Sequence, residues 1–475
     1  MEVEKDSEIL MENEFSSRSR QKNIKKLKSE IFELLIIGGG ITGAGTACEA
    51  VTRGLKTALV EMNDYASGTS SKSSKLLHGG LRYLEHFKIK LVFESLKDRN
   101  QLFKRIPHIA KPLSFIAPVY KGYKETVFIL NLGVSMYDLL SFASRNMVTK
   151  IHRLLTGKGI IKYEPEIRSD GLKGGIQYFD GNCDDARLTL ETIKTAARKG
   201  VTIANYIKII GFEKDIHGKA KTAIAKDLST GEEFKIKADM ILNAAGPWVD
   251  AVNKADNNDY KNKLKPTKGI HIVVPRLTNG NALLLKTPKP PVRWVFVIPY
   301  QDYSIIGTTD TENQSKNGDF SYLESDNHAN KEEINYLLET VNHYFPDAKM
   351  DNDSIISSYG GWRPLIAPPE GEKISESDIS REHEIFETDS GIVCIAGGKL
   401  TTYMAMSKGI VDYLLKKEEF KKYGTNLSHF PNLCSWDENF DLNKYLEKET
   451  KKYTITDKPI IRKLINKYGT EYLKV

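Results

Sequence analysis

The feature that most constrains this chain is a strand, a glycine turn and a helix of small residues close to the N-terminus. Residues 32–37 form an apolar run with β-branched residues at its end, and the turn Gly38-Gly39-Gly40-Ile41-Thr42-Gly43 follows it directly. A second apolar run, 57–60, ends on an acid, Glu61. This order and spacing match the fingerprint of a dinucleotide-binding βαβ unit. We therefore expect a dinucleotide to bind at this turn.

Each glycine of the turn has its own physical role. Gly38 allows the tight turn, Gly40 lets the backbone approach a pyrophosphate, and Gly43 lets the helix pack closely on the strand. The helix N-terminus offers unpaired N–H groups and partial positive charge to phosphates. Glu61 stands where it can accept a hydrogen bond from a ribose hydroxyl. A mobile loop is the alternative for a bare glycine triad, but the strand, helix and acid favour dinucleotide binding.

Length and composition are those of a globular protein of two or three domains. The chain has 475 residues and a formal net charge of +7. Several basic residues lie in a polar leader that runs to about Ser29, which we interpret as a solvated, frayed terminus. Contact of this leader with a membrane surface or with nucleic acid is the alternative, and we expect no nucleic-acid partner.

The cysteines and apolar runs exclude other classes of protein. Cys48, Cys183, Cys394 and Cys434 lie far apart, so we expect neither a disulfide framework nor a metal site. We also expect no secretory signal peptide, because the N-terminus is polar and charged. The most apolar stretch, 126–142, contains polar residues and predicts a buried or interfacial helix rather than a membrane span.

Nucleotide-domain patterns recur along the chain instead of filling one block. Strand patterns run into small residues and glycines near residues 37, 243 and 396. Between about 252 and 353 the patterns are those of strands and turns, with one helix predicted at 331–344. We therefore expect a substrate domain that is inserted between parts of a nucleotide-binding domain.

The number of glycine fingerprints bears on which dinucleotide is bound. An enzyme that holds FAD and NAD(P)H in paired domains usually has two fingerprints, and this chain has one. One fingerprint, a late strand-Gly-Gly-helix pattern and an inserted β-rich region suggest FAD, held for chemistry on a small substrate. The predicted fold class is α/β, with a Rossmann-like FAD-binding domain interleaved with a mixed β-rich substrate domain. The predicted bounds are 1–30 for a polar basic extension, 31–83, 165–250 and 354–420 for the FAD-binding domain, 84–164 and 251–353 for the substrate or cap domain, and 424–475 for a short helical C-terminal region.

Seven stretches resemble the motifs of the FAD-dependent glycerol-3-phosphate dehydrogenases, a family with the D-amino-acid-oxidase-like flavoprotein fold. The two most specific are Lys75-Leu76-Leu77-His78-Gly79-Gly80-Leu81-Arg82-Tyr83-Leu84 and Gly397-Gly398-Lys399-Leu400-Thr401-Thr402-Tyr403. The others are 184–188, 243–248, 268–275, 307–310 and 363–365. They occur in the family's order, and the resemblance runs from about residue 32 to 410.

The resemblance implies a reaction, its partners and a location. The expected reaction is the oxidation of sn-glycerol 3-phosphate to dihydroxyacetone phosphate by hydride transfer to flavin N5, with the electrons passed to a quinone. The enzyme would be cytoplasmic and peripheral on the inner face of the cell membrane, and a homodimer is one possible assembly. A basic amphipathic helix predicted at 87–104 and the apolar stretch 126–142 favour the membrane contact.

Three alternatives share these motifs. A soluble glycerol-3-phosphate oxidase would pass the electrons to O2 and release H2O2, and the motifs do not separate it from the dehydrogenase. A related enzyme that acts on an amine has the same fold, but a set of arginines argues for an anionic phosphate. A catalytically silent flavin-binding interaction protein is the remote alternative.

The candidate substrate-binding residues are cationic or lie next to cations. A dianionic phosphate requires positive charge, and the planar fork of arginine suits its oxygens. The family match implies Arg82 and Arg381 for the phosphate and Arg363 for the other substrate oxygens, with Tyr83 beside Arg82. Lys399 is expected to touch the substrate or to stabilise the reduced flavin. For each single arginine, a surface salt bridge is the alternative.

Two histidines are candidates for the base that removes the proton of the substrate hydroxyl. His271 lies in an apolar strand pattern, so a structural core histidine is an equal alternative. His78 precedes two glycines, and its alternative is to hold the loop beneath the flavin. The expected catalytic set is therefore His271, His78, Arg363 and Lys399, and the choice of base stays open.

The residues expected to hold FAD come from the glycine fingerprint, a small-residue loop and two later motifs. They are Gly38, Gly40, Thr42, Gly43, Glu61, Thr69, Ser70, Ser71, Ser74, Lys75, Ala245, Gly246, Gly398, Lys399, Leu400 and Thr401.

Overall fold

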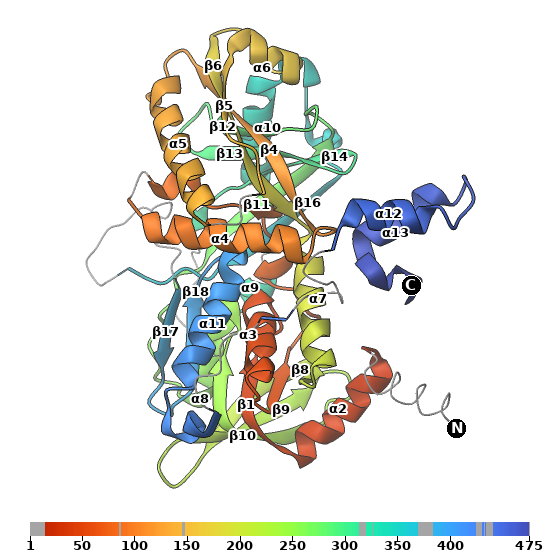
Figure 1. The fold of residues 1–475 in the computed structure, drawn as a ribbon. Coiled ribbons are helices and arrows are strands. Elements are labelled where there is room, and N and C mark those ends of the chain that lie inside the picture. The colour runs from red at the N-terminus through yellow and green to blue at the C-terminus, as the bar shows by residue number, and fades with distance from the viewer. Residues whose placement is uncertain are drawn as a thin grey trace.

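Two sheets organise the protein, one in each half of the molecule (Figure 1). The structure is a computed structural model that describes residues 15–84, 87–144, 148–312, 320–325, 327–368, 383–423, 430–431, 433 and 440–474. Within these residues one sheet has eight strands and the other has ten. Helices pack on both halves, so the predicted α/β fold class is confirmed.

The first sheet is built around the strand of the glycine fingerprint. β1 (Ile31–Ile37) pairs in parallel with β10 (Glu233–Asn243) on one side and with β2 (Thr57–Val60) on the other. The three strands end at the same edge, and ligands bind at this edge in folds with such a sheet. The other strands of the sheet are β7 (Thr202–Ala204), β8 (Ile207–Lys214), β9 (Ala220–Asp227), β17 (His383–Glu387) and β18 (Val393–Gly397).

Helices cover both faces of the first sheet. One face carries α3 (Ile41–Thr52), α7 (Asp185–Arg198) and α11 (Tyr403–Leu414), and the other carries α2 (Ser17–Ser29) and α8 (Val249–Asp256). The side chains of β1 alternate between the two layers, as a strand buried on both faces requires, so that Leu34 belongs to one core and Leu35 to the other.

The polar leader contains an ordered helix, so the prediction of a frayed terminus is wrong for its second half. A capping box at Ser16 and Ser19 begins α2. Leu27 is fully buried against the second core of the sheet, and Arg20 forms an ion pair with Asp227 at 2.9 Å. The buried apolar area and the ion pair hold the leader on the sheet although most of its residues are polar.

The second sheet is mixed and forms the upper half of Figure 1. Its longest strands are β4 (Ala110–Tyr120) and β6 (Leu172–Cys183), which pair antiparallel along almost their whole length. The other strands are β3 (Leu76–Leu77), β5 (Arg153–Thr156), β11 (Thr267–Pro275), β12 (Ala282–Lys286), β13 (Trp294–Tyr300), β14 (Tyr303–Gly307), β15 (Thr311–Glu312) and β16 (Ser357–Arg363).

The second half and the C-terminal region contain the remaining helices. They are α4 (Ile89–Arg105), α5 (Val127–Ala143), α6 (Gly157–Tyr163), α9 (Tyr322–Ser325), α10 (Lys331–Tyr344), α12 (Leu442–Thr450) and α13 (Lys458–Tyr468). The helix predicted at 331–344 is therefore present with the same bounds. Figure 1 shows α4 at the junction of the two halves and α12 and α13 beside the body of the molecule.

The predicted domain bounds stay a prediction, and two strands show why they are hard to draw. β6 and β16 fall within ranges that we expected in the FAD-binding domain, yet both pair with strands of the second sheet. Chain segments therefore run from one sheet into the other several times, and residues from both halves meet at the candidate site.

Candidate active site

The glycine turn has the geometry that its three roles require. Gly38 adopts a φ of +116°, and a side chain there would begin 2.5 Å from the Ala244 carbonyl. A side chain at Gly43 would begin 1.9 Å from the Gly38 carbonyl, which explains the close packing of α3 on β1. At Gly40 the nearest atom is the Ser70 hydroxyl at 3.2 Å. Space for a ligand therefore lies over Gly40, at the N-terminus of α3.

Glu61 ties the turn to the end of β2. Its carboxylate accepts hydrogen bonds from the N–H of Gly39 at 2.6 Å and from the N–H of Asn63 at 2.8 Å. Burial raises the pKa of Glu61 above its usual range, against the effect of these hydrogen bonds. Because Glu61 also lines the cavity described next, it stands where a ribose acceptor is expected.

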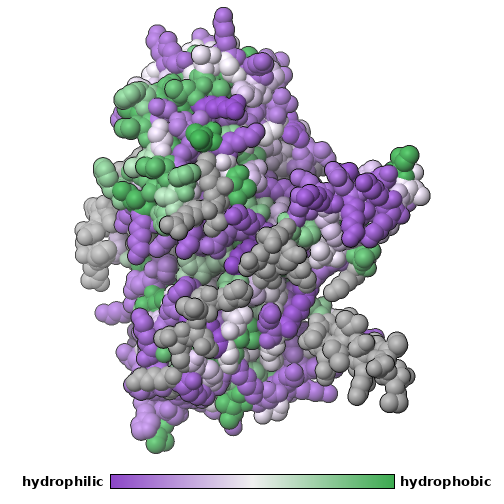
Figure 2. Space-filling view, in the orientation of Figure 1, coloured by the Kyte–Doolittle hydropathy of each residue, from purple (hydrophilic) through white to green (hydrophobic). Residues whose placement is uncertain are grey.

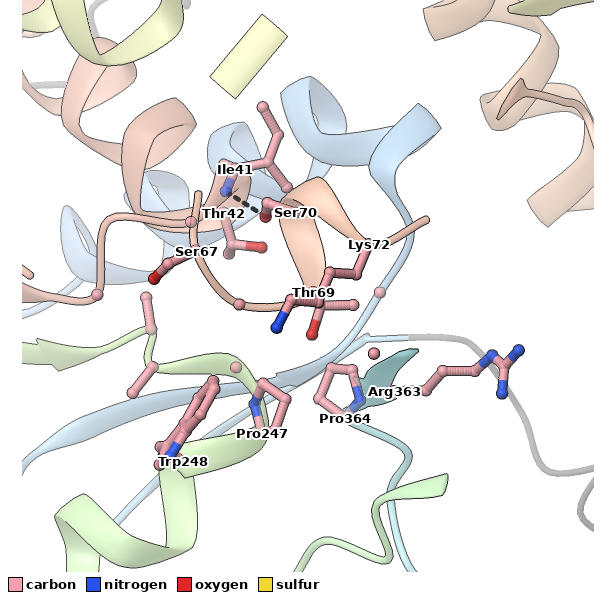
Figure 3. A pocket seen from close by; sticks show the side chains of 18 of the residues that line it. Ile41, Thr42, Ser67, Thr69, Ser70, Lys72, Pro247, Trp248, Arg363 and Pro364 are labelled. Carbon is pink, nitrogen blue, oxygen red and sulfur yellow. Dashed lines mark hydrogen bonds between the residues drawn. The ribbon is translucent and has the colours of Figure 1, made fainter. Parts of the chain in front are cut away.

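A cavity of about 590 Å³ runs from the glycine turn to the start of α11. Figure 3 shows its two walls, with Thr69, Ser70 and Lys72 on one side and Pro247 and Trp248 on the other. The Ser70 hydroxyl accepts a hydrogen bond from the N–H of Ile41 at 2.9 Å, which fixes the small-residue loop on the first turn of α3. The predicted residues that line the cavity are Gly38, Gly40, Thr42, Glu61, Thr69, Ser70, Ser74, His78, Ala245, Gly246, His271, Arg363, Gly398, Lys399, Leu400 and Thr401.

Other predicted residues lie beside the cavity rather than in its lining. Gly43 and Ser71 support the lining from the adjacent turns. The Lys75 ammonium forms an ion pair with Asp185 at 2.6 Å, and Asp185 also accepts a hydrogen bond from the Ser73 hydroxyl at 2.7 Å. Asp185 therefore braces the small-residue loop, and a contact of Lys75 with FAD stays a prediction.

Several residues of the lining were not predicted from the sequence. Ser67 and Lys72 belong to the same small-residue loop as predicted residues, and Trp248 ends a recognised motif, so proximity in sequence was the available signal. Ile207 and Phe320 line the cavity as well, and no local pattern marks them. Their place depends on how distant segments pack.

Arg363 is held by a set of oriented bonds. Its guanidinium donates to Asp310 at 2.5 Å, to the Thr308 hydroxyl at 2.7 Å and to the Thr309 carbonyl at 3.0 Å. A side chain at Gly269 would begin 2.2 Å from this group, so the guanidinium lies against the Gly269 backbone. The alternative for Arg363 was an exposed salt bridge on the protein surface. The Arg363 side chain is only 16% exposed, so its ion pair with Asp310 is largely buried. The ion pair therefore belongs to the cavity wall.

The two arginines predicted for the phosphate cannot be placed in the same way. Arg82 lies in the 3₁₀ turn Leu81–Leu84, and its side chain is outside the described part of the structure. Arg381 lies outside the described residues altogether. Their contacts with substrate stay predictions.

His271 lies on β11 behind a hydroxyl that lines the cavity. Its Nε2 is 2.8 Å from the Ser74 hydroxyl, and its ring stacks on Tyr359 with 4.9 Å between the ring centroids. Burial lowers the pKa of His271 to about 3, and the charges of Arg363 and Lys75 act in the same direction. His271 is therefore neutral at neutral pH in this structure.

His78 and Lys399 meet where the second sheet approaches α11. The backbone N–H of His78 donates to the Thr401 hydroxyl at 3.2 Å. The Lys399 ammonium lies 3.6 Å from the centroid of the Tyr83 ring. Lys399 immediately precedes the 3₁₀ turn Leu400–Thr402 that leads into α11, so its charge and the helix N-terminus lie at the same end of the cavity.

The lining fits FAD. The open space over Gly40, the N-terminus of α3 and the acid at the end of β2 suit the pyrophosphate and the ribose. The cation and helix N-terminus at the far end suit the flavin edge that becomes negative on reduction. Within the described residues no group of three or more His, Cys, Asp and Glu side chains is arranged to hold a metal ion.

Comparisons with known proteins agree with this geometry. A model of the FAD dependent oxidoreductase family matches residues 33–409. The chain belongs to this family. An aerobic glycerol-3-phosphate dehydrogenase of Staphylococcus aureus (strain USA300) is 39% identical over 465 residues, which cover 96% of this chain and 81% of the relative. The predicted resemblance and the predicted dependence on FAD are thereby confirmed.

Solved structures of several enzymes share this fold to different degrees. The glycerol-3-phosphate dehydrogenase from Bacillus halodurans, complexed with FAD, aligns with a TM-score of 0.76 at 32% identity and covers 97% of this chain and 80% of its own. The L-α-glycerophosphate oxidase from Mycoplasma pneumoniae aligns with a TM-score of 0.61 at 16% identity, over 86% of this chain and 98% of its own. The glycine oxidase from Geobacillus kaustophilus aligns at 0.58 and 18%, over 82% of this chain and 96% of its own. The last two likenesses concern the fold alone.

Proposed function

We propose that this FAD-dependent oxidoreductase converts sn-glycerol 3-phosphate to dihydroxyacetone phosphate and passes the electrons to a quinone. The observation that carries the proposal is the 39% identity, over nearly the whole chain, to a relative named an aerobic glycerol-3-phosphate dehydrogenase. The oriented guanidinium of Arg363 and the ammonium of Lys399 at the cavity support a substrate that is an anion.

The residues of the chain divide into those that hold the cofactor and those that hold the substrate. Bound FAD supplies a hydride acceptor. Gly40, Thr42 and Glu61 would hold its phosphates and ribose, together with Thr69 and Ser70 of the adjacent 3₁₀ turn. We place the Arg363 guanidinium beside the substrate oxygens as a fixed positive charge, because its bonds to Asp310 and Thr308 hold it at the cavity wall.

The proton of the C2 hydroxyl has to leave together with the hydride, and we favour His271 over His78 as its acceptor. His271 is in its neutral, proton-accepting form at neutral pH, but a pKa of about 3 makes it a weak base before substrate binds. Its Nε2 is paired with the Ser74 hydroxyl, which lines the cavity. The negative charge of a bound phosphate would raise the pKa of His271 and so strengthen it as a base.

The peripheral membrane contact is part of the proposal, and the apolar surface of α5 supports it. This surface consists of Phe128, Ile129, Leu132, Leu139 and Phe142, each at least 54% exposed. Figure 2 shows an apolar patch over α5. An apolar patch of this kind on a protein surface marks a contact with a partner or a membrane.

The charges around α5 favour an anionic bilayer as that partner. The exposed basic residues Lys121 and Lys124 precede the helix, and Lys150 and Arg153 follow it. Across the described part of the chain, no helix is both long and apolar enough to span a bilayer. We therefore propose that the protein lies on the inner face of the cell membrane, with α5 against the lipid.

A substrate panel tests the proposed reaction. Purified protein with FAD is assayed with an artificial electron acceptor and, in turn, sn-glycerol 3-phosphate, glycerol and glycine. We expect turnover with the phosphate ester alone, because glycerol and glycine lack the phosphate. Turnover with glycine would favour an amine-oxidising enzyme, and no turnover with any of the three would favour the silent flavin protein.

The acceptor is tested separately. The enzyme is reduced without oxygen and then mixed with a water-soluble quinone analogue or with O2. We expect faster reoxidation by the quinone. Fast reoxidation by O2 with one H2O2 for each reduced flavin would favour the oxidase alternative.

A further inference from the structure

The turn 78–80 connects the second sheet to the far end of the cavity. His78 lines the cavity, and its N–H is bonded to Thr401 next to Lys399. A side chain at Gly80, which has a φ of +82°, would begin 2.2 Å from the Tyr83 ring that stacks with Lys399. A shift of this turn would therefore move both the His78 side chain and the pair formed by Tyr83 and Lys399.

The middle residue of the turn, Gly79, is held by a buried polar cluster. Its N–H donates to the Tyr137 hydroxyl at 2.7 Å and lies 3.2 Å from Oδ1 of Asp180. The Tyr137 hydroxyl donates in turn to the Asp180 carboxylate at 2.8 Å. A side chain at Gly79 would begin 2.5 Å from the Tyr137 oxygen, so the close approach requires glycine. A tyrosine of α5 and an aspartate of β6 thus hold one backbone N–H of the turn.

The cluster also contains a charge pair in the protein interior. Arg99 of α4 donates to Asp180 at 2.6 Å, and the two side chains are 0% and 4% exposed. The remaining N–H groups of Arg99 donate to Asn100, to the Ser141 hydroxyl and to the Phe179 carbonyl. A buried ion pair gives no more stability than apolar side chains of the same volume. The polar cluster instead contributes a defined geometry, because hydrogen bonds have preferred distances and angles and so fix the positions of the groups that they join.

We propose that Tyr137 is a positioning residue that sets the turn 78–80 through the N–H of Gly79. By this contact it places His78 and the pair formed by Tyr83 and Lys399 at the end of the cavity where the substrate is oxidised. Tyr137 is only 1% exposed and acts through the turn. The proposal rests on the proposed function, because that function makes this end of the cavity the substrate site.

The test compares Tyr137→Phe with a matched variant, Tyr120→Phe. The Tyr120 hydroxyl donates to the Arg168 carbonyl at 2.8 Å, so each variant removes one tyrosine hydroxyl and its hydrogen bond. Tyr120 lies seven residues along β4 from Leu113, the residue that pairs with Asp180. At the rise of a β-strand this separation is about 23 Å. Tyr120→Phe should therefore lose about as much stability as Tyr137→Phe, while the turn 78–80 keeps its contacts.

Two readouts follow, one with substrate and one without it. In Tyr137→Phe we expect a rate constant for flavin reduction by sn-glycerol 3-phosphate that is about 3- to 10-fold lower, with a smaller change in KM. We also expect a changed visible circular dichroism of the bound flavin, at unchanged FAD content. Tyr120→Phe should match the parent in its reduction rate and in its flavin dichroism. Its unfolding midpoint should fall by about as much as that of Tyr137→Phe.

Each outcome decides the proposal. Equal reduction rates and equal flavin dichroism in the two variants would overturn it. Loss of FAD or of folding in Tyr137→Phe alone would show a merely structural role and would overturn it as well. If sn-glycerol 3-phosphate does not reduce even the parent, the proposed function fails, and the dichroism of the flavin decides the role of Tyr137 independently.

Discussion

At the scale of single residues, two glycines of the same turn differ in what a side chain would meet. At Gly43 the first atom of a side chain would lie 1.9 Å from a backbone carbonyl, so a substitution there disrupts the fold itself. At Gly40 the φ of −76° suits any residue, and the one close neighbour is the Ser70 hydroxyl. Gly40 is therefore the position at which cofactor binding can be separated from folding.

We predict that Gly40→Val folds and loses most of its FAD. The valine side chain would occupy the space where the pyrophosphate is expected, while the backbone conformation at this position accepts it. The measurement is the flavin-to-protein absorbance ratio after purification, together with the unfolding midpoint of the FAD-free protein. A yellow variant with a full complement of FAD would show that the cofactor lies elsewhere.

We predict that Arg363→Lys damages catalysis although the charge is kept. Lysine is a point charge and cannot replace a two-pronged contact, and a lost charge-assisted hydrogen bond costs about 1.5–3 kcal/mol, or roughly ten- to a hundredfold in kcat/KM. The matched control is Arg293→Lys, because Arg293 contacts the carbonyl and the carboxylate of the same Asp310, at 3.0 and 3.3 Å, but does not line the cavity. Single-turnover flavin reduction at equal FAD occupancy measures the difference. Equal losses in both variants would remove Arg363 from the site.

At the scale of helices and strands, the sequence predicted the bounds of those elements that are set by interactions between neighbouring residues. The bounds of α10 were predictable because Asn330 and Glu333 form a capping box before an amphipathic run. β1 and β2 were predictable because glycines and an acid end them. The helix α2 was missed because its two apolar side chains, Ile24 and Leu27, stand among eleven polar ones and make too short a periodic pattern.

The candidate site also has parts that are set by local sequence and parts that are set by contacts between distant segments. The glycine turn and the small-residue loop are continuous in sequence, so their place in the cavity lining was predictable. The register of β11 with β16 brings Thr267 opposite Arg363, and no local pattern contains that pairing. The partners Asp310 and Ser74 depend on such pairings. For this reason the sequence indicated most of the residues that line the cavity, and the structure shows which partners orient their side chains.

We predict that α2 contributes to the stability of the nucleotide-binding half. Leu27→Ala should lower the free energy of unfolding by about 2–5 kcal/mol, because it leaves a cavity in a fully buried site. Lys22→Ala, at an exposed position of the same helix, should change the unfolding free energy by less than about 0.5 kcal/mol. Denaturant unfolding of the two variants measures both values, and equal values would mean that the helix is not docked in solution.

We predict that α5 carries the membrane contact. The double variant Phe128→Ser with Leu132→Ser should bind anionic lipid vesicles about tenfold or more weakly, because each large apolar side chain contributes about 1.5–3 kcal/mol when buried. The matched control replaces Ile216 and Ile455 by serine, since both are exposed apolar residues outside α5. Co-sedimentation with vesicles measures the binding. If the two double variants bind equally, α5 does not face the lipid.

At the scale of the whole molecule, the two sheets meet at one cavity and contribute different parts of the chemistry. The first sheet brings the glycine turn and Glu61 to the cavity, where we expect the cofactor. The second brings Arg363 and His271 from neighbouring strands to the same cavity, where we expect the substrate. An oxidoreductase built in this way should complete the first half of its reaction without any external acceptor.

The most direct test of this account is therefore one anaerobic turnover. Enzyme with bound FAD is mixed with an equal amount of sn-glycerol 3-phosphate in the absence of oxygen and of any acceptor. The flavin absorbance and the amount of dihydroxyacetone phosphate are then measured in the same sample. We predict that the yellow colour bleaches and that one dihydroxyacetone phosphate forms for each flavin reduced. A flavin that stays oxidised while the substrate is bound, or bleaching without this product, would contradict the proposed reaction.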